Sequence, residues 1–192
     1  MSAGGLLVAV LAFTSCGGSG DREALEKMIL ASMAETGPES CLKFNTLRLL
    51  ETTTDREGKA AVSACEEDAR DPSLEQPTDV DVSRVETEGD SGSAVLAFRG
   101  SILDGQRVQY AFVEREDRWK FDETVGFVDL DATHLVMQMG REGMLHAETP
   151  QDAENVACWI GRMERMSDKA LEDLLFGDGA ESSNCTAESS AI

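Results

Sequence analysis

Two side chains in the middle of the chain combine acid–base chemistry with an apolar setting. Glu123 is predicted to lie on the apolar face of a strand, because it shares its alternate positions with Trp119, Phe121, Val125 and Phe127. Tyr110, the only tyrosine of the chain, occupies the same kind of position in the preceding strand. A carboxylate with a raised pKa beside a phenol can polarise a carbonyl group and move a proton. The plainer interpretation, which we favour, places Glu123 at a bulge or strand end, paired with an arginine, and Tyr110 in the core with its hydroxyl at the rim.

The other reactive residue types form no catalytic or metal-binding pattern. The two histidines, His134 and His146, have no partners at HExxH or comparable spacing, and no Walker, GxSxG or GxGxxG motif occurs. An enzyme normally needs several groups that converge, so catalytic, cofactor-binding and metal residues are all predicted as none, with Glu123 and Tyr110 as the weak candidates.

The first twenty residues indicate export. Residues 5–13 read GLLVAVLAF, an apolar run that is long enough for a secretory signal and too short to span a bilayer. Thr14, Ser15 and Cys16 follow, and they resemble the lipobox of bacterial lipoproteins. That resemblance implies a signal peptide over 1–15, lipidation of Cys16 with acyl chains such as palmitate, and a flexible Gly/Ser tether over 16–20. Phe13 and the absence of Lys or Arg before Arg22 depart from the usual pattern. Two alternatives therefore stay open: an ordinary signal with another cleavage site, or a translation start upstream of Met1.

The remaining cysteines agree with an exported chain. Four cysteines remain, an even number, and none has CxxC spacing: Cys41, Cys65, Cys158 and Cys185. This pattern favours disulfides over a zinc site. Four cysteines allow three connectivities. We expect the sequential pairs Cys41–Cys65 and Cys158–Cys185, because each pair lies within one region of the chain.

The charge of the chain excludes some partners. It has 192 residues, with 37 acidic against 17 basic side chains and a formal net charge of −20. Nucleic-acid backbones and anionic lipid headgroups are bound by clustered Lys and Arg, so we expect neither as a partner. Attachment to the membrane would therefore depend on lipid at Cys16.

Hydrophobic periodicity predicts helices first and then strands. Helices are expected over 21–35, with an inner face of Leu25, Met28, Ile29 and Met33, over 39–50 and over 59–70. Strands follow over 80–87, 94–99, 107–115 and 118–128, with short turns between them, so the sheet should be an antiparallel meander. The fold class is α+β, with the N-terminal helices packed on a curved four-stranded antiparallel meander.

Three features of this part of the chain carry a resemblance. They are the Cys41 to Cys65 spacing, the turn and strand VETEGDSGSAVLAF (85–98) and the hairpin YAFVEREDRWKFDE (110–123). With them, residues 21–130 resemble the nuclear transport factor 2-like superfamily, whose cone-shaped fold is shared with ketosteroid isomerases and polyketide cyclases, and above all its small bacterial extracytoplasmic lipoproteins. The resemblance implies a pocket between sheet and helices but matches no full catalytic set.

A helical extension is predicted after the sheet, over 131–177. It comprises a short helix over 131–140, a connector over 143–147, a helix capped by Thr149 with Pro150 at its first position, and a last helix capped by Ser167. Residues 178–192 are expected to form an acidic, mostly mobile tail.

These observations predict a binding protein. We expect a non-catalytic lipoprotein that is anchored by lipid to the outer face of the cell membrane and binds a small apolar ligand or an envelope protein. The alternative is a small cofactor-free isomerase or dehydratase of the polyketide-cyclase or ketosteroid-isomerase type. A pocket in which two or more polar side chains converge would favour the alternative.

Overall fold

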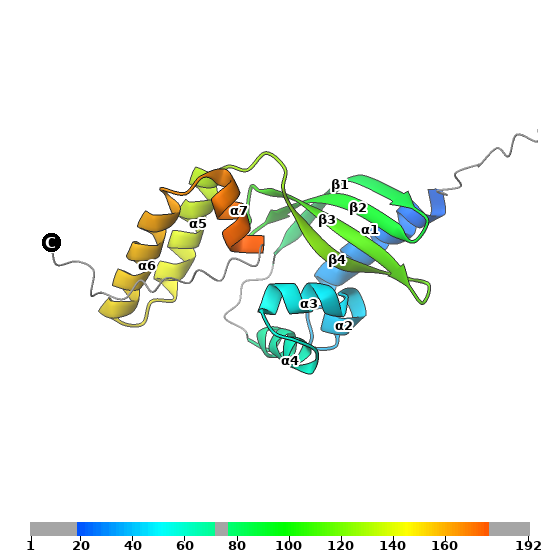
Figure 1. Cartoon of the computed structure of the whole chain (residues 1–192), viewed down its shortest axis with the longest axis horizontal. Helices are drawn as coiled ribbons and strands as arrows, with labels where there is room; N and C mark the ends of the chain where they lie inside the picture. Colours follow the sequence, from blue (N-terminus) through cyan, green and yellow to red (C-terminus); the bar gives the residue numbers. More distant parts are fainter. Residues whose placement is uncertain (1–18, 72–76, 177–192) are drawn as a thin grey trace, which may run out of the picture.

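A four-stranded antiparallel sheet lies at the centre of the protein, whose computed structural model describes residues 19–71 and 77–176 (Figure 1). Its strands are β1 (Asp79–Glu88), β2 (Ser91–Arg99), β3 (Arg107–Arg115) and β4 (Arg118–Phe127), and they pair in chain order. The predicted α+β meander is therefore confirmed. The turn between β3 and β4 consists of Glu116 and Asp117, both with positive φ (54° and 59°), which suits the right-handed twist of a tight hairpin.

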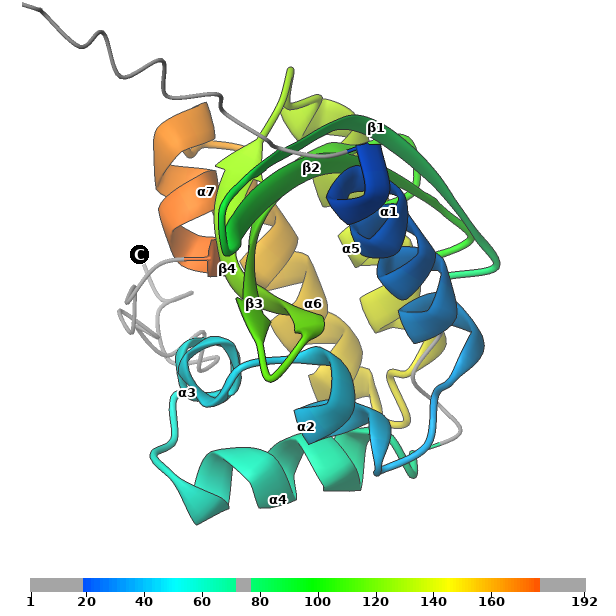
Figure 2. The same cartoon turned by 90° about the vertical axis from the view of Figure 1, so that its right-hand side faces the viewer.

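Helix α1 (Ser19–Ala34) packs in the hollow of the curved sheet (Figure 2). Its predicted inner face is confirmed: Leu25 and Ile29 are fully buried, and Met28 and Met33 pack partly buried against the same core. The helix begins at Ser19, two residues before the predicted start, so the last two residues of the expected tether are helical.

The helix predicted over 39–50 is wrong as a single element. The chain forms α2 (Ser40–Phe44) and, after a break, α3 (Leu47–Thr54). The backbone N–H of Thr46 donates to the carbonyl oxygen of Phe121 on β4 (2.9 Å), which takes it out of the helical pattern. The Thr46 hydroxyl then accepts from the N–H of Leu49 (3.2 Å) and caps α3. A contact with the edge of the sheet therefore divides the helix.

A disulfide joins these helices to the next one. Helix α4 (Lys59–Asp68) carries Cys65, which is bonded to Cys41 of α2, with a Cα–Cα distance of 6.1 Å. The first predicted pair is thus confirmed. Around it, Cys41, Leu50 and Ala61 form a small core of their own.

The extension after the sheet consists of α5 (Ala132–Leu145), α6 (Pro150–Met163) and α7 (Asp168–Phe176). The caps of α6 and α7 are as predicted, because Thr149 and Asp152 form a capping box and the Ser167 hydroxyl accepts from the N–H of Ala170. Helix α5 runs through Gly140 and Gly143, whereas the sequence predicted a connector over 143–147. The two glycines stay helical where α6 packs against them.

Two larger cores follow from this arrangement. One lies between α1, α3 and the sheet, and the other, around Leu135, Val136, Met163 and Leu171, lies within the extension. Among the described residues, no helix combines the length and hydropathy that crossing a membrane requires. The expected signal peptide, Cys16, Cys185 and the tail over 178–192 lie outside the described residues.

Candidate functional site

A cavity of about 310 Å³ opens between the helices and the sheet. Its walls are mostly apolar and come from α1, α2, α3 and three strands, including Met33, Phe44, Leu49, Phe98, Leu103 and Phe121. Small-molecule sites in proteins are typically concave and apolar, with a few polar groups, and begin at about this volume. The cavity is therefore the part of the described chain best suited to hold a small molecule.

Tyr110 reaches this cavity from β3. Its ring makes edge-to-face contacts with Phe98 and Phe121, with centroids 6.2 and 5.4 Å away, and these two rings hold it in place. Burial raises the pKa of Tyr110 above its ordinary value of 10.0, so the phenol is neutral and can donate a hydrogen bond at any physiological pH.

Most of the other polar groups that line the cavity already have partners. Ser32 Oγ donates to the carbonyl oxygen of Ile29 (2.7 Å), and Asn45 Nδ2 donates to that of Cys41 (3.0 Å). Ser101 Oγ accepts from the N–H of Leu103 (3.2 Å). These bonds satisfy groups that would otherwise have to be bound by a ligand or by water.

The Tyr110 hydroxyl makes no hydrogen bond within the described part of the chain. No fully buried polar side-chain atom there lacks a partner, so the hydroxyl must be reached by solvent from the cavity. A donor that is held by two aromatic rings and directed to an apolar cavity can bind one acceptor, such as a carbonyl or ether oxygen.

Glu123 does not lie beside Tyr110, and its predicted place on the apolar face is wrong. In the pairing of β3 with β4, Phe112 faces Phe121, Ala111 faces Glu123 and Tyr110 faces Thr124. Asp122 therefore has no paired residue on β3 and forms a β-bulge, which turns the following residue to the other face of the sheet. A second bulge at Val125 restores the alternation, so Val125 is exposed and Phe127 packs against the core.

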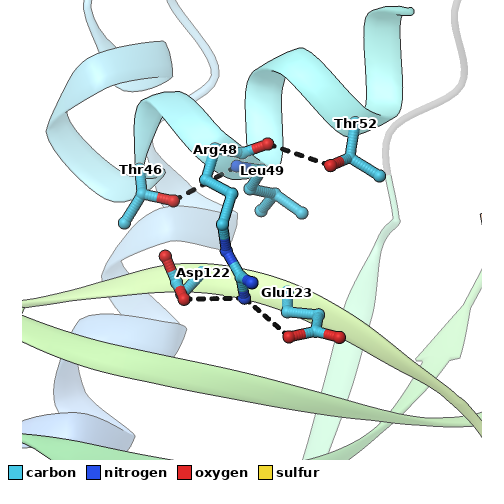
Figure 3. A network of polar contacts seen from close by, with 6 residues as sticks. All are labelled: Thr46, Arg48, Leu49, Thr52, Asp122 and Glu123. Atoms are coloured by element: carbon cyan, nitrogen blue, oxygen red, sulfur yellow. Dashed lines mark hydrogen bonds and ion pairs between the residues drawn. The ribbon is translucent and has the colours of Figure 1, made fainter.

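Glu123 instead forms an ion pair that joins β4 to α3 (Figure 3). Arg48 of α3 donates to Glu123 (2.6 Å) and contacts Asp122 (2.8 Å), and the Glu123 side chain is 54% exposed. The hydrogen bond to Glu123, with the charges of both carboxylates, raises the pKa of Arg48. This arrangement is the arginine pairing at a bulge that the sequence left open for Glu123, and Tyr110 lies against the core.

A larger cleft of about 840 Å³ borders this ion pair. Arg48, Asp122 and Glu123 line it on one side, and Leu174, Leu175 and Phe176 of α7 line the other. Its charged groups are exposed and screened by water, so they are less suited to hold a small molecule than the mostly apolar cavity.

The histidines lie outside the cavity. The Nε2 atom of His134 contacts Gln138 (3.0 Å), and that of His146 contacts Glu142 (2.9 Å). Within 19–71 and 77–176, no three His, Cys, Asp or Glu side chains are grouped as metal ligands. The sequence analysis predicted a pocket between sheet and helices but did not identify the residues of α1, α2 and α3 that form its wall, because the alternation of β4 directed attention to Glu123.

Comparison of the chain with protein-family models, curated proteins and solved structures gives no match.

Proposed function

We propose that the protein is a non-catalytic binding protein that holds a small apolar molecule in the cavity between α1, α2, α3 and the sheet. The observation that carries the proposal is the Tyr110 hydroxyl, which has no hydrogen-bond partner among the described residues and lies at a mostly apolar cavity. The ligand that fits is an apolar molecule with one hydrogen-bond acceptor. The nuclear transport factor 2-like resemblance of residues 21–130 supports the same proposal, since it implies a pocket at this place.

The binding function is preferred to an isomerase or dehydratase because of the groups around the cavity. Proton transfer needs a base within hydrogen-bond reach of the substrate. Tyr110 is the only titratable residue among those that line the cavity, and Glu123 lies on the opposite face of the sheet. The described residues therefore supply one donor and no second group for acid–base work.

The experiment is a titration with two matched probes, 2-acetylnaphthalene and 2-ethylnaphthalene, which differ by a carbonyl oxygen. Both should bind the wild-type protein, and Ser32→Phe, which fills the cavity from α1, should abolish binding of both. Ala34→Phe, at an exposed position of the same helix, is the control and should bind like the wild type. Tyr110→Phe should weaken the ketone by roughly two- to tenfold, the value of one neutral hydrogen bond, and leave the hydrocarbon unchanged. Binding of both probes by Ser32→Phe would contradict the proposal.

We also propose that this binding protein is exported and anchored by lipid on Cys16 to the outer face of the cell membrane. The support is the apolar run 5–13, the residues Thr14-Ser15-Cys16 and the Cys41–Cys65 disulfide, which is typical of oxidising compartments. Intact-mass measurement of the membrane fraction should find a chain that begins at Cys16 with added acyl mass. Cys16→Ser should abolish the acyl mass, and an unmodified Cys16 in the mature protein would contradict the anchor.

A further inference from the structure

An apolar groove runs between α5 and α6, on a part of the molecule separate from the cavity with Tyr110. It has a volume of about 710 Å³. Four of the eight methionines of the chain line it, Met137, Met144, Met163 and Met166, together with Val156 and Ile160. Methionine side chains are unbranched and polarisable, so they adapt to the shape of an apolar partner.

The outer part of this groove is exposed. Met137 is 61% and Met144 51% exposed, and the neighbouring Leu145 is 70% exposed. Exposed large apolar side chains are unremarkable singly, but a contiguous group of them is typical of an interaction surface. These two methionines lie seven residues apart on α5, so they are on one face, two turns from each other.

The groove is preformed by the packing of its two helices. A Cβ atom on Gly140 would lie 3.1 Å from Ile160, and one on Gly143 would lie 3.1 Å from Val156, so the glycines allow α6 to approach α5 closely. Leu135, Val136 and Met163 are buried beneath. The surface is thus held in shape before a partner arrives, which lowers the entropic cost of binding.

The net charge of the extension, together with Glu164 in the lining of the groove, indicates which partner the groove fits. The extension over 131–176 has nine acidic and four basic side chains, a net charge of −5, within a chain of net charge −20. A second copy of the chain or an anionic membrane would be repelled. An amphipathic helix with a basic polar face combines apolar side chains for the groove with complementary charge, and α5 is 14 residues long, enough to lie along such a helix for several turns.

We propose that the α5–α6 groove binds a basic amphipathic helix of a partner protein. Leucine or isoleucine side chains of that helix would contact Met137 and Met144, and its Lys or Arg side chains would face Glu164 and the other carboxylates of the extension. This interaction does not depend on the ligand cavity, from which it is separate.

The test is calorimetric titration of the folded protein with a synthetic helix of about 18 residues that has leucine at i, i+3, i+4 and i+7 spacing and lysine elsewhere. The wild-type protein should bind the helix, and the double variant Met137→Ser, Met144→Ser should bind it with an affinity about tenfold lower or more. Leu30→Ser, Leu42→Ser removes two comparably exposed apolar side chains outside the groove and should bind like the wild type. All variants are first checked for unchanged thermal unfolding.

Three results would overturn the proposal. The first is equal affinity for a helix in which glutamate replaces each lysine, because charge would then play no part. The second is unchanged binding of the lysine helix by the methionine double variant. The third is a wild-type protein that does not bind the lysine helix but forms a dimer in sedimentation experiments or binds phosphatidylcholine vesicles. Loss of the dimer or of vesicle binding in the methionine double variant would then assign the groove to that occupant.

Discussion

Gln106 and Asp131 exchange two hydrogen bonds across 25 residues of sequence. Gln106 Nε2 donates to the carbonyl oxygen of Asp131, and the N–H of Asp131 donates to Gln106 Oε1, both at 3.1 Å. Gln106 is 1% exposed and is the only buried polar side chain among the described residues. Asp131 also caps α5, because its carboxylate accepts from the N–H of His134 (2.9 Å). The pair therefore joins the end of the β2–β3 loop to the start of the extension.

Gln106→Leu should destabilise the protein by about 1–3 kcal/mol, because it keeps the approximate size of the side chain but removes both hydrogen bonds to Asp131. The backbone N–H of Asp131 then has no partner, whereas its carbonyl oxygen still accepts from the N–H of Leu135. Urea unfolding measures the effect as a lower midpoint. Gln109→Leu is the control, since Gln109 lies three residues further on, in β3, without a side-chain hydrogen bond among the described residues, and its shift should be within about 0.5 kcal/mol. Equal shifts for the two variants would remove any special role of the Gln106–Asp131 pair.

Loss of the Cys41–Cys65 disulfide should lower the free energy of unfolding by about 3 kcal/mol in the chain-entropy estimate, since the bridge closes a loop with a sequence separation of 24. The double variant Cys41→Ala, Cys65→Ala tests this in thermal and urea unfolding. Because α2 carries Phe44, which lines the cavity, probe binding should also weaken. The wild-type protein in dithiothreitol is the comparison, and unchanged stability after verified reduction would contradict the estimate.

The ionisation of Tyr110 can be followed by absorbance without interference from other phenols, because it is the only tyrosine of the chain. Burial raises its pKa in the folded state above the ordinary value of 10.0, so the native protein should show no phenolate absorbance at 295 nm near pH 10, whereas the protein unfolded in urea should.

The same shift sets the direction of a pH effect on stability. Above pH 10 the unfolded chain releases the Tyr110 proton and the folded chain keeps it, so this contribution to stability is complete below pH 10 and is lost as pH rises towards the folded pKa. The difference in unfolding free energy between wild type and Tyr110→Phe should therefore change above pH 10 and be constant between pH 7 and 9. A pH-independent difference throughout would contradict burial of the phenol.

Glu123→Gln should leave probe binding in the cavity unchanged, because the side chain lies on the outer face of β4. The ion pair with Arg48 is exposed, so its loss should cost about 0–1 kcal/mol, and less at high salt. Fluorescence titration of the naphthyl probes and urea unfolding give the two readouts. A loss of probe affinity in Glu123→Gln without a change in stability would place this carboxylate in the binding function after all.

Much of the architecture was predictable from local patterns. Alternation and short turns indicated the meander, the spacing of Leu25 and Ile29 indicated the inner face of α1, and Thr149 and Pro150 indicated the start of α6. These features depend on neighbours in the sequence, where steric preferences and side-chain capping act. The Cys41–Cys65 pair was also predictable, because both residues lie in one region of the chain.

The candidate site was predictable only in part. Tyr110 was identified, and Met33 was predicted on the inner face of its helix, but no local pattern showed that these residues and Phe44 line one cavity. The Arg48 ion pair was foreseen only as an arginine of unknown position, because the contact joins residues 75 apart in the sequence.

The amino-acid sequence by itself determined the four strands and most of the helical segments, because propensity, periodicity and capping act over a few residues. Only the tertiary structure decided where Glu123 points, since the bulges at Asp122 and Val125 depend on how β4 pairs with β3. It also decided that the helix after Pro38 breaks at Thr46, whose N–H bonds to the sheet instead of to its own helix. In each case a hydrogen bond or a strand pairing between distant residues outweighs a local preference of a few tenths of a kcal/mol to about 1 kcal/mol, and that balance exists only in the folded chain.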